Sequence, residues 1–360
     1  MKQILCLSHE PWSTFPSRTQ HLITRLKDTQ ILFFQPCGEN RGEYREKGRR
    51  VRPGVVLYTL PPVMPYLQEH PRLYAMGRRR LARFVDRVAQ RHRFRNPLLW
   101  TTCPDQFPML DALSYGALLY DCDRDWSQYP IHWESELTLA ADLVFAASAG
   151  LADHLSPCSG NIALIPNGGN HPMFSRDDLS RPLPMLDLEG PVLGWAGAVS
   201  ADLDLAPLLY TARAHPDWNF LLLGAADPAN PLLDRVRACP NVIVRQLDSL
   251  LELPDYLAWC DVCLNLLRER DNGLDIVPSR IYEYLSTGHP VVTMLWPDQV
   301  EHFPDVIYGA HSPESFCRLC EQALAEAPGW VSGRRRNYGR QAAWSHRAAE
   351  VDRILSTAGF

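Results

Sequence analysis

Short apolar runs alternate with helical patterns along the whole chain. In the first half the strand-like runs are QILCLS (3–8), QILFFQP (30–36), VVLYTL (55–60), PLLWTT (97–102), GALLYDC (116–122), DLVFAAS (142–148) and IALIPN (162–167). Segments with helical periodicity, such as SRTQHLITRLKD (17–28), lie between several of them. The alternation predicts parallel strands joined by crossover helices, an α/β fold. In such sheets ligands bind beyond the carboxyl ends of the strands.

The pattern is interrupted after Asn167 by SRDDLSRPLPMLDLEGP (175–191), which is polar and proline-rich and therefore predicts a linker. A second alternating series follows, with the strand-like runs PVLGWAG (191–197), FLLLG (220–224), VIVRQL (242–247), VCLNLL (262–267) and PVVTML (290–295). Its helical patterns include DLAPLLYTARAHP (204–216) and LPDYLAWC (253–260). A chain of 360 residues suits two domains.

We therefore expect two doubly wound, Rossmann-like domains facing across a cleft, which is a common place for ligands. The first domain is expected over residues 1–172, the linker over 173–190 and the second domain over 191–339. The final segment, GRQAAWSHRAAEVDRILSTAG (339–359), has the pattern of one long amphipathic helix that packs back on the first domain.

Composition is that of a globular protein, with 46% hydrophobic and 21% charged residues. The N-terminal MKQILCLSHEPW has too short an apolar run for a signal peptide. The most apolar window, AADLVFAASAGLA (140–152), is too short to cross a bilayer. These features predict a cytoplasmic protein.

Ten cysteines are scattered through the chain, and two pairs, Cys260/Cys263 and Cys317/Cys320, have CxxC spacing. The first pair lies in a strand pattern and the second in a helix pattern, whereas zinc sites place such pairs on knuckle-like turns. Reduced, mostly buried thiols are the favoured interpretation, and no metal is expected.

Charge is distributed unevenly. Residues 1–170 hold 20 Lys and Arg against 16 Asp and Glu, and the remainder holds 16 against 25. Much of the positive charge lies in RLYAMGRRRLARFVDRVAQRHRFR (72–95), which has nine arginines and an apolar stripe at helical spacing formed by Leu73, Leu81, Phe84, Val85 and Val88. This segment is either a solvated helix face or a surface for anionic lipid headgroups or a lipid-diphosphate acceptor. An acidic protein without a recognition motif is not expected to bind nucleic acid.

The stretch PSRIYEYLSTGHPVV (278–292) carries the clearest candidate chemistry. Ser279 and Arg280 follow Pro278 at a helix N-terminus, where unpaired N–H groups attract phosphate. Glu283 projects to the same side as both, while Ile281, Tyr284 and Leu285 should face the core. A phosphate at Ser279 and Arg280 would place an attached ribose within reach of the Glu283 carboxylate. The alternative is a surface ion pair between Arg280 and Glu283.

Two loops at predicted strand ends add candidates. RERDNGLDIV (268–277) brings Arg268, Arg270, Asn272, Gly273 and Asp275 to the ligand edge, where the Asp275 carboxylate could receive sugar hydroxyls or be an ordinary loop acid. Gly194 and Gly197 flank another strand-to-loop turn, at which a ligand can approach the backbone. Neither a GxGxxG dinucleotide fingerprint nor a GxxxxGK[ST] phosphate loop is present.

In the first domain, the loop after the first strand holds His9, Glu10, Trp12, Arg18 and His21. A histidine at a strand end can act as a general base or as a sugar ligand, although it can also be a polar loop residue without a catalytic task. YDCDRDW (120–126) places Asp121, Asp123 and Asp125 after another strand, where alternate acids are equally typical of turns and caps.

Together these motifs resemble those of bacterial GT-B glycosyltransferases, in particular the family 4-like group that builds cell-wall and surface polysaccharides. PSRIYEYLSTGHPVV is similar to the donor-site motif P-x-K-x-x-E-Y-L-A-x-G-x-P-V-V, and IPNGGNHPMF (165–174) is similar to the IPNGVDxxxF that closes the first domain. YDCDRDW, ESELTLAADLVFAASAGLADHL (134–155) and the opening of the second domain also follow the group's pattern. The resemblance covers residues 95–295 well and the N-terminal third loosely.

The resemblance implies roles for individual residues. Glu283 would bind the donor ribose, and Ser279, Arg280 and the backbone near Gly197 would hold the diphosphate. Asp275 stands at the first acidic position of the group's E-x7-E pattern, but as the shorter Asp. Arg280 replaces the commoner Lys, and ADLDLAP (201–207) lacks the basic residue of the group's Lys-Gly. The missing charge would then come from Arg280 or from Arg268, Arg270 or Arg18.

The implied activity is transfer of a sugar from a nucleotide-diphosphate sugar (UDP, GDP, dTDP or ADP) to a polysaccharide or lipid-linked acceptor, without a metal or other cofactor. The first domain would bind the acceptor. The resemblance favours retention of the anomeric configuration, whereas an inverting enzyme would need a base, for which His9 is preferred to Asp123. Two alternatives are a GT-B sugar-nucleotide epimerase and a non-catalytic nucleotide-sugar-binding partner of a biosynthetic complex.

Overall fold

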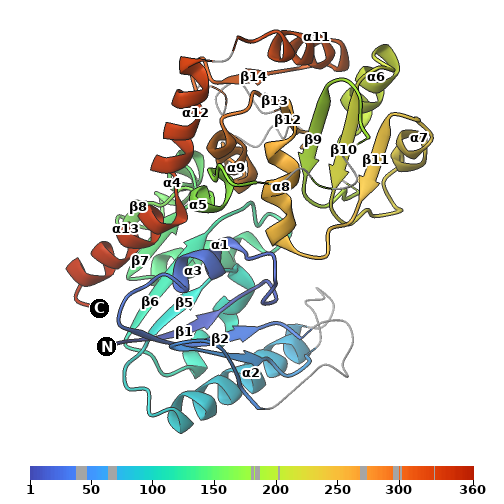
Figure 1. Cartoon of the computed structure of the whole chain (residues 1–360). Coiled ribbons are helices and arrows are strands. Elements are labelled where there is room, and N and C mark those ends of the chain that lie inside the picture. The colour runs from blue at the N-terminus through green and yellow to red at the C-terminus, as the bar shows by residue number, and fades with distance from the viewer. Residues whose placement is uncertain are drawn as a thin grey trace. The chain divides into compact units, whose positions relative to one another are not determined.

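The computed structural model describes residues 1–37, 47–63, 71–179, 182, 187–201, 203–267, 274–294, 300, 302–327 and 329–360. The chain divides into two compact units, drawn in Figure 1. Unit 1 comprises Met1–Pro166 and Ser345–Phe360, and unit 2 comprises Asn167–Trp344. The division lies at residue 166 rather than at 172, because the following segment, which ends in the buried Phe174, belongs to the core of unit 2.

Unit 1 is built on an eight-stranded sheet with the order β3-β4-β2-β1-β5-β6-β7-β8. Its strands are β1 (Lys2–Leu7), β2 (Thr29–Gln35), β3 (Arg49–Arg52), β4 (Val55–Thr59), β5 (Leu98–Thr101), β6 (Ala117–Cys122), β7 (Leu143–Ala146) and β8 (Ile162–Leu164). All neighbouring pairs are parallel except β3 and β4. The central strands are buried throughout, as expected for a parallel sheet that is covered on both faces.

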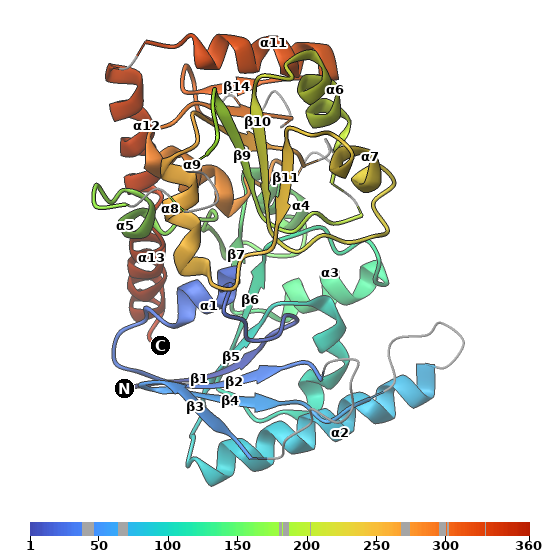
Figure 2. The same cartoon turned by 45° about the vertical axis from the view of Figure 1, so that its right-hand side comes forward.

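The helices of unit 1 are α1 (Arg18–Ile23), α2 (Pro71–Arg91), the 3₁₀ helix η2 (Pro104–Ala112), α3 (Ile131–Ala140), α4 (Ala149–Leu155) and α13 (Trp344–Thr357). Figure 2 shows α2 running alongside β2 and β4, against which Phe84 packs with its ring centroid 6.4 Å from those of Phe34 and Tyr58. At the other end of the chain, the Asp352 carboxylate of α13 lies 2.6 Å from the Lys2 ammonium of β1. The C-terminal helix is therefore part of unit 1.

Unit 2 contains a six-stranded, fully parallel sheet with the order β11-β10-β9-β12-β13-β14. Its strands are β9 (Val192–Ala196), β10 (Asn219–Leu223), β11 (Val242–Arg245), β12 (Val262–Asn265), β13 (Val291–Thr293) and β14 (Ile307–Gly309). Its helices are α5 (His171–Phe174), α6 (Ala206–Ala214), α7 (Leu233–Arg237), the 3₁₀ helix η4 (Leu250–Glu252), α8 (Leu253–Ala258), α9 (Ser279–Thr287), α11 (Pro313–Leu324) and α12 (Trp330–Gln341). Two apolar cores, one on each face of the sheet, hold these helices.

The predicted α/β class with two doubly wound parallel sheets is confirmed, and each of the twelve predicted strands is present. Two short strands, β3 and β14, were not predicted. The C-terminal helix expected over 339–359 to pack on the first domain is confirmed as α13, but it begins later than predicted, because a break separates it from α12. At the break the Gly169 N–H donates to the Ala342 carbonyl at 3.0 Å, and the Gly169 carbonyl accepts from the Trp344 N–H at 3.0 Å.

The remaining expectations concern thiols and the helix α2. All ten cysteines are free, and those in CxxC spacing are buried. On α2, Leu81, Phe84, Val85 and Val88 are buried as predicted, whereas Leu73 is 50% exposed and lies outside the apolar stripe. Among the described residues, no helix combines the length and the apolar character needed to span a membrane.

Candidate active site

The helix α9 follows a loop at the carboxyl edge of the unit 2 sheet, and its sequence explains its limits. Pro278 is extended and precedes the first helical residue, Ser279, and Gly288 ends the helix in the left-handed conformation with φ of 86°. Ile281, Tyr284 and Leu285 are fully buried, as predicted. The opposite face carries Arg280 and Glu283, which are half-buried.

The guanidinium group of Arg280 stacks on an aromatic ring that the sequence did not single out. Its central carbon lies 3.9 Å from the ring centroid of Trp195, a fully buried residue of β9. The Trp195 indole N–H donates to the Gly197 carbonyl at 3.0 Å, which fixes the ring. A guanidinium group over an indole face is a favourable cation–π arrangement, strongest where water is excluded.

Gly197 is required for this placement. Its φ is +142°, in a region that side chains rarely adopt, and a Cβ atom there would lie 2.8 Å from Nη1 and 2.9 Å from Nη2 of Arg280. The absence of a side chain therefore leaves the space that the guanidinium group occupies. The position of the Arg280 guanidinium group therefore explains why residue 197 is a glycine.

Among the described residues, Nη1 of Arg280 is buried and has no hydrogen-bond partner. Burial lowers the pKa of Arg280, while Tyr284 and the Glu283 carboxyl group raise it. Arginine keeps its charge in proteins, so a buried N–H donor without an acceptor favours binding of an anion. The N–H groups of the first turn of α9 lie at the same end of the helix.

Glu283 is held by a loop from the start of unit 2. Burial raises the pKa of Glu283 to about 7, against the opposing effects of Arg280 and of the backbone N–H that Asn170 donates to the carboxylate. A Cβ atom on Gly169 would lie 3.0 Å from the backbone nitrogen of Glu283, so only glycine lets this loop approach α9 so closely. The motif IPNGGN thus supports Glu283, a role that the sequence did not reveal.

The other donor-side candidates are less completely defined. Asp275 has a positive φ of 39°, and its carboxylate lies 3.4 Å from Nε2 of His302, a residue that the sequence analysis did not single out. Ser279 occupies the first position of α9. The candidates Arg268, Arg270, Asn272 and Gly273 lie outside the described residues.

In unit 1, His9 lies beyond the carboxyl end of β1 and is fixed on two sides. Its Nδ1 lies 2.8 Å from the Thr102 hydroxyl oxygen, and its ring meets that of Trp126 edge-on at 4.9 Å. Its Nε2 is 3.4 Å from the Glu10 carboxylate. The contact with His9, together with the nearby Arg124, lowers the pKa of Glu10 to about 2 although burial opposes the shift.

Arg18 and Asp123 are engaged by charged neighbours within unit 1. Arg18 forms an ion pair with Asp121 at 3.0 Å, in which both side chains are almost fully buried. Burial nevertheless raises the pKa of Asp121, so the charged form of this carboxyl group depends on Arg18 for stabilisation. Asp123 pairs with Arg124 at 3.0 Å, and Arg124 also contacts Glu10 at 2.6 Å. The charge of Arg18 faces Asp121, and its part in phosphate neutralisation stays a prediction.

Comparison with known proteins supports the fold and the class of enzyme. No protein-family model matches the chain. The chain is 27% identical over 276 residues, 69% of its length and 68% of the relative's, to a Bacillus subtilis protein provisionally assigned as the teichuronic acid biosynthesis glycosyltransferase TuaH.

Several solved structures are similar over nearly their whole length. Sucrose-phosphate synthase from Thermosynechococcus elongatus has a TM-score of 0.75 at 14% identity, covering 99% of both chains. The E. coli trehalose-6-phosphate structure bound with UDP-2-fluoro glucose has a TM-score of 0.76 at 10% identity, covering 98% of this chain and 99% of that one. A Burkholderia xenovorans trehalose-phosphate synthase in complex with glucose-6-phosphate has a TM-score of 0.73 at 11% identity, covering 98% and 100%.

The predicted resemblance is confirmed: the chain has the GT-B fold, and its relative at 27% identity is provisionally assigned as a glycosyltransferase. The prediction of a glycosyltransferase is confirmed at the level of enzyme class, and these relatives give no support to an epimerase.

Proposed function

We propose that the chain is a retaining, metal-independent glycosyltransferase that transfers a sugar from a nucleotide diphosphate to a polysaccharide or lipid-linked acceptor. The observation that carries the proposal is the buried Nη1 of Arg280, which lacks an acceptor among the described residues, beside the Glu283 carboxyl group and the start of α9. Unit 2 would bind the donor and unit 1 the acceptor.

Each group has a task in this mechanism. Arg280 and the N–H groups of the first turn of α9 would neutralise the departing diphosphate, where charge develops in the transition state. The open backbone at Gly197 would let a phosphate oxygen approach closely. Glu283, as a carboxylate, would accept hydrogen bonds from the two ribose hydroxyls. Asp275 would contact the transferred sugar.

The donor site is tested by calorimetric titration of the full chain with UDP, GDP, dTDP and ADP sugars. We expect sugars of one nucleotide class to bind. UDP sugars are the first to test, because a structural neighbour holds a UDP sugar. Arg280→Lys should weaken binding about tenfold to a hundredfold, as expected for the loss of charge-assisted hydrogen bonds. Glu314→Gln, a change at an exposed acid of unit 2, serves as the matched control. Unchanged binding in Arg280→Lys would refute the assignment.

Stereochemistry and catalysis need a separate measurement. NMR of the product formed with a cell-surface polysaccharide fragment should show the anomeric configuration of the donor retained. Inversion would instead indicate a general base, for which His9 is the first candidate. The transfer rate, measured as a function of pH, should then fall in His9→Gln. Binding of a nucleotide sugar without transfer or hydrolysis would favour a non-catalytic partner. The relative named for teichuronic acid biosynthesis makes an acidic cell-wall polymer the first acceptor to test.

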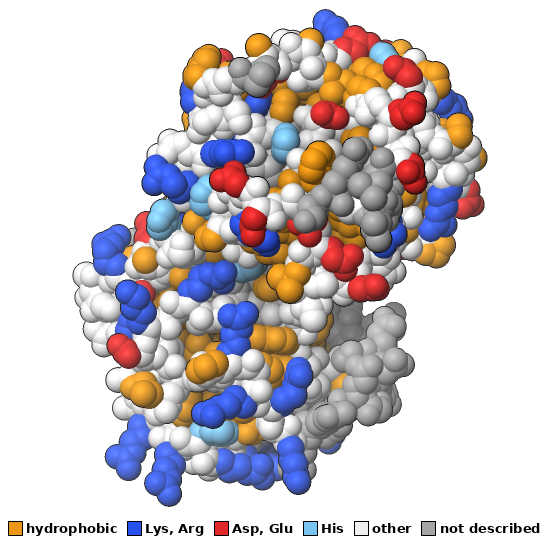
Figure 3. All heavy atoms as spheres, viewed as in Figure 1, with side chains coloured by type: hydrophobic (Ala, Val, Ile, Leu, Met, Phe, Trp, Pro, Cys, Tyr) orange, Lys and Arg blue, Asp and Glu red, His pale blue; other side chains and the backbone are white. Residues whose placement is uncertain are grey.

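A lipid-linked acceptor requires access to a membrane, and unit 1 has a surface suited to one. The exposed arginines of α2 are Arg72, Arg79, Arg80, Arg83, Arg87 and Arg91. Figure 3 shows basic side chains gathering over the part of unit 1 where α2 lies. Near the start of the same helix, Leu73 and Met76 are 50% and 67% exposed. Clustered positive charge beside exposed apolar side chains favours peripheral binding to anionic lipids at the inner face of the membrane.

Sedimentation with vesicles of phosphatidylglycerol or phosphatidylcholine tests this second proposal. The protein should bind the anionic vesicles and be released by salt, because the attraction is electrostatic. Replacing Arg79, Arg83 and Arg87 by Gln should abolish binding. A control with the same loss of charge on unit 2, at the exposed Arg213, Arg235 and Arg237, should bind like the original protein. Equal loss in both variants would refute a specific role for α2.

A further inference from the structure

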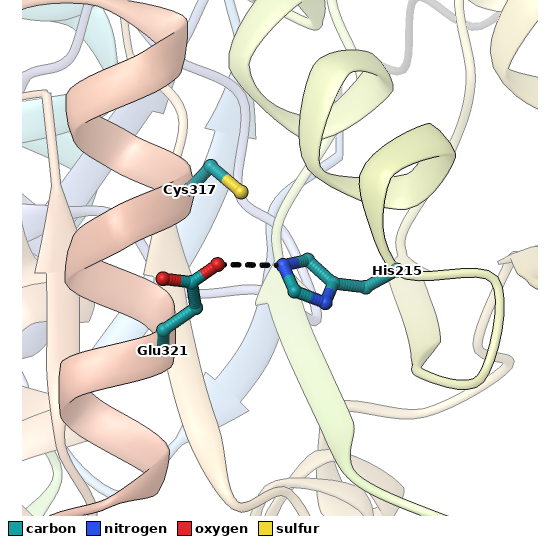
Figure 4. Close-up of side chains that lie close together, drawn as sticks. All are labelled: His215, Cys317 and Glu321. Atoms are coloured by element: carbon teal, nitrogen blue, oxygen red, sulfur yellow. Dashed lines mark hydrogen bonds and ion pairs between the residues drawn. The ribbon is translucent and has the colours of Figure 1, made fainter.

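A second group of reactive side chains lies elsewhere in unit 2. His215, Cys317 and Glu321 each place one donor atom within 4.8 Å of the others, the one such group found among the described residues. Figure 4 shows Cys317 and Glu321 on one helix and the His215 ring directed toward them. His215 is the residue that follows α6, whereas Cys317 and Glu321 lie on α11. Their i, i+4 spacing puts the thiol and the carboxylate on one helix face, as in other helical metal sites.

The imidazole is oriented toward α11 by contacts on its other sides. Its ring stacks on Trp218 with 3.7 Å between centroids and 8° between planes. The His215 carbonyl accepts a hydrogen bond from the Asn241 side-chain amide at 3.0 Å, which holds the backbone at the end of α6. In this orientation Nε2 lies 2.9 Å from the Glu321 carboxylate oxygen. Such support is typical of a ligand whose geometry is fixed before binding.

We propose that His215, Cys317 and Glu321 form a binding site for a divalent transition-metal ion of the zinc class. Imidazole, thiolate and carboxylate are the ligands that zinc accepts, and the thiol favours a borderline metal over magnesium or calcium. Three protein ligands leave a fourth position for water. With bonds of about 2.0–2.3 Å, tetrahedral ligand atoms lie farther apart than the 2.9 Å between Nε2 and the Glu321 oxygen but closer than 4.8 Å, so small side-chain shifts would admit the ion. The thiol proton is released to solvent.

The topology separates this site from the donor site. Helix α6 leads from the loop after β9, at the carboxyl edge of the sheet, back to the amino end of β10, which begins at Asn219. His215 therefore lies at the amino edge, whereas Gly197 and the start of α9 belong to the carboxyl edge. A metal at His215 would clamp α6 to α11 and stabilise unit 2. The proposal is independent of the proposed glycosyl transfer.

Cobalt(II) is the probe, because thiolate ligation gives it a near-ultraviolet charge-transfer band. The full chain, stripped with EDTA, should bind one equivalent of Co²⁺ with this band, and Zn²⁺ should displace it and raise the thermal midpoint. Cys317→Ser should abolish the band, and His215→Ala and Glu321→Gln should each weaken binding at least tenfold. Cys239→Ser, at a partly buried cysteine of the same unit, is the matched control and should bind like the original protein.

The result can overturn the proposal in two ways. Absence of the band in the original chain would do so, as would a band that persists in Cys317→Ser, since that result means an adventitious metal only. Cys317 is buried, so Cys317→Ser could fail to fold. In that case Glu321→Gln decides the matter, because Glu321 is half exposed and its replacement leaves the core intact. Co²⁺ affinity unchanged in Glu321→Gln would refute the site.

Discussion

Replacement of Glu283 by Gln should make the protein more stable at neutral pH while weakening donor binding. The pKa of Glu283 is raised from 4.5 to about 7 in the folded state, chiefly by burial. A carboxyl group whose folded pKa is raised stabilises the fold below its unfolded pKa of 4.5, and this contribution is lost as pH rises through about 7. Ionised Glu283 therefore costs stability at pH 8, a cost that Gln does not have.

The magnitude follows from the same shift. At 1.36 kcal/mol per pKa unit, a rise from 4.5 to about 7 corresponds to ~3 kcal/mol as an upper bound, and partial exposure reduces it to ~1–3 kcal/mol. The amide oxygen of Gln still accepts the Asn170 N–H, so the loop contact survives. As pH rises from 5 to 8, the unfolding free energy of Glu283→Gln minus that of the original chain should increase by ~1–3 kcal/mol.

Urea unfolding followed by tryptophan fluorescence at both pH values measures this difference. Glu314→Gln is the control: Glu314 is exposed and its pKa is lowered rather than raised, so its replacement should not stabilise the protein as pH rises. A difference between Glu283→Gln and the original chain that is equal at pH 5 and pH 8 would contradict the burial argument. In parallel, nucleotide-sugar affinity of the original chain should fall as pH drops below about 7, and Glu283→Gln should bind weakly at every pH.

Two further changes test the packing around the site and the core of unit 2. Gly197→Ala should abolish donor binding measured by calorimetry, because the new Cβ would lie 2.8 Å from Nη1 of Arg280 and the backbone has a φ of +142°. Gly333→Ala is the control and should bind the donor normally, because a Cβ there meets nothing within 4 Å. Glu326→Gln should lower the unfolding free energy by ~3 kcal/mol in urea titrations, because it leaves the fully buried Arg335 without the carboxylate that lies 2.6 Å away. The first expectation is contradicted if Gly197→Ala binds the donor about as tightly as the original chain. The second is contradicted if Glu326→Gln loses less than ~1 kcal/mol of unfolding free energy.

The fold was predictable because its central strands are fully buried and therefore apolar along their length. The two strands that escaped prediction lack this signal. β3 (Arg49–Arg52) is basic, exposed and antiparallel at the edge of its sheet, and β14 (Ile307–Gly309) has three residues. The C-terminal helix begins later than predicted for another reason, because Ala342 and Trp344 at the break hydrogen-bond to Gly169, far away in sequence. Local periodicity carries no information about such a contact.

The same distinction applies to the candidate site. Arg280 and Glu283 could be found because a helix start, a strand end and a known motif coincide within a few residues. The stack of Arg280 on Trp195 and the N–H donated by Asn170 join segments that are distant in the chain, so no spacing could predict them. Arg18 shows the same limit, since its buried pairing with Asp121 joins residues that are 103 positions apart.

These contacts give a physical reason for the departure of this chain from the pattern it resembles. The segment 201–207 has no basic residue, so the described part of the proposed donor site would rely on Arg280 for its positive charge. A planar guanidinium group can lie flat on Trp195 and still direct an N–H outward, whereas the compact ammonium of a lysine would gain less from the ring and offer no fork. Arginine at 280, tryptophan at 195 and glycine at 197 therefore form one packed group, in which the ring carries the guanidinium group and the glycine leaves room for it.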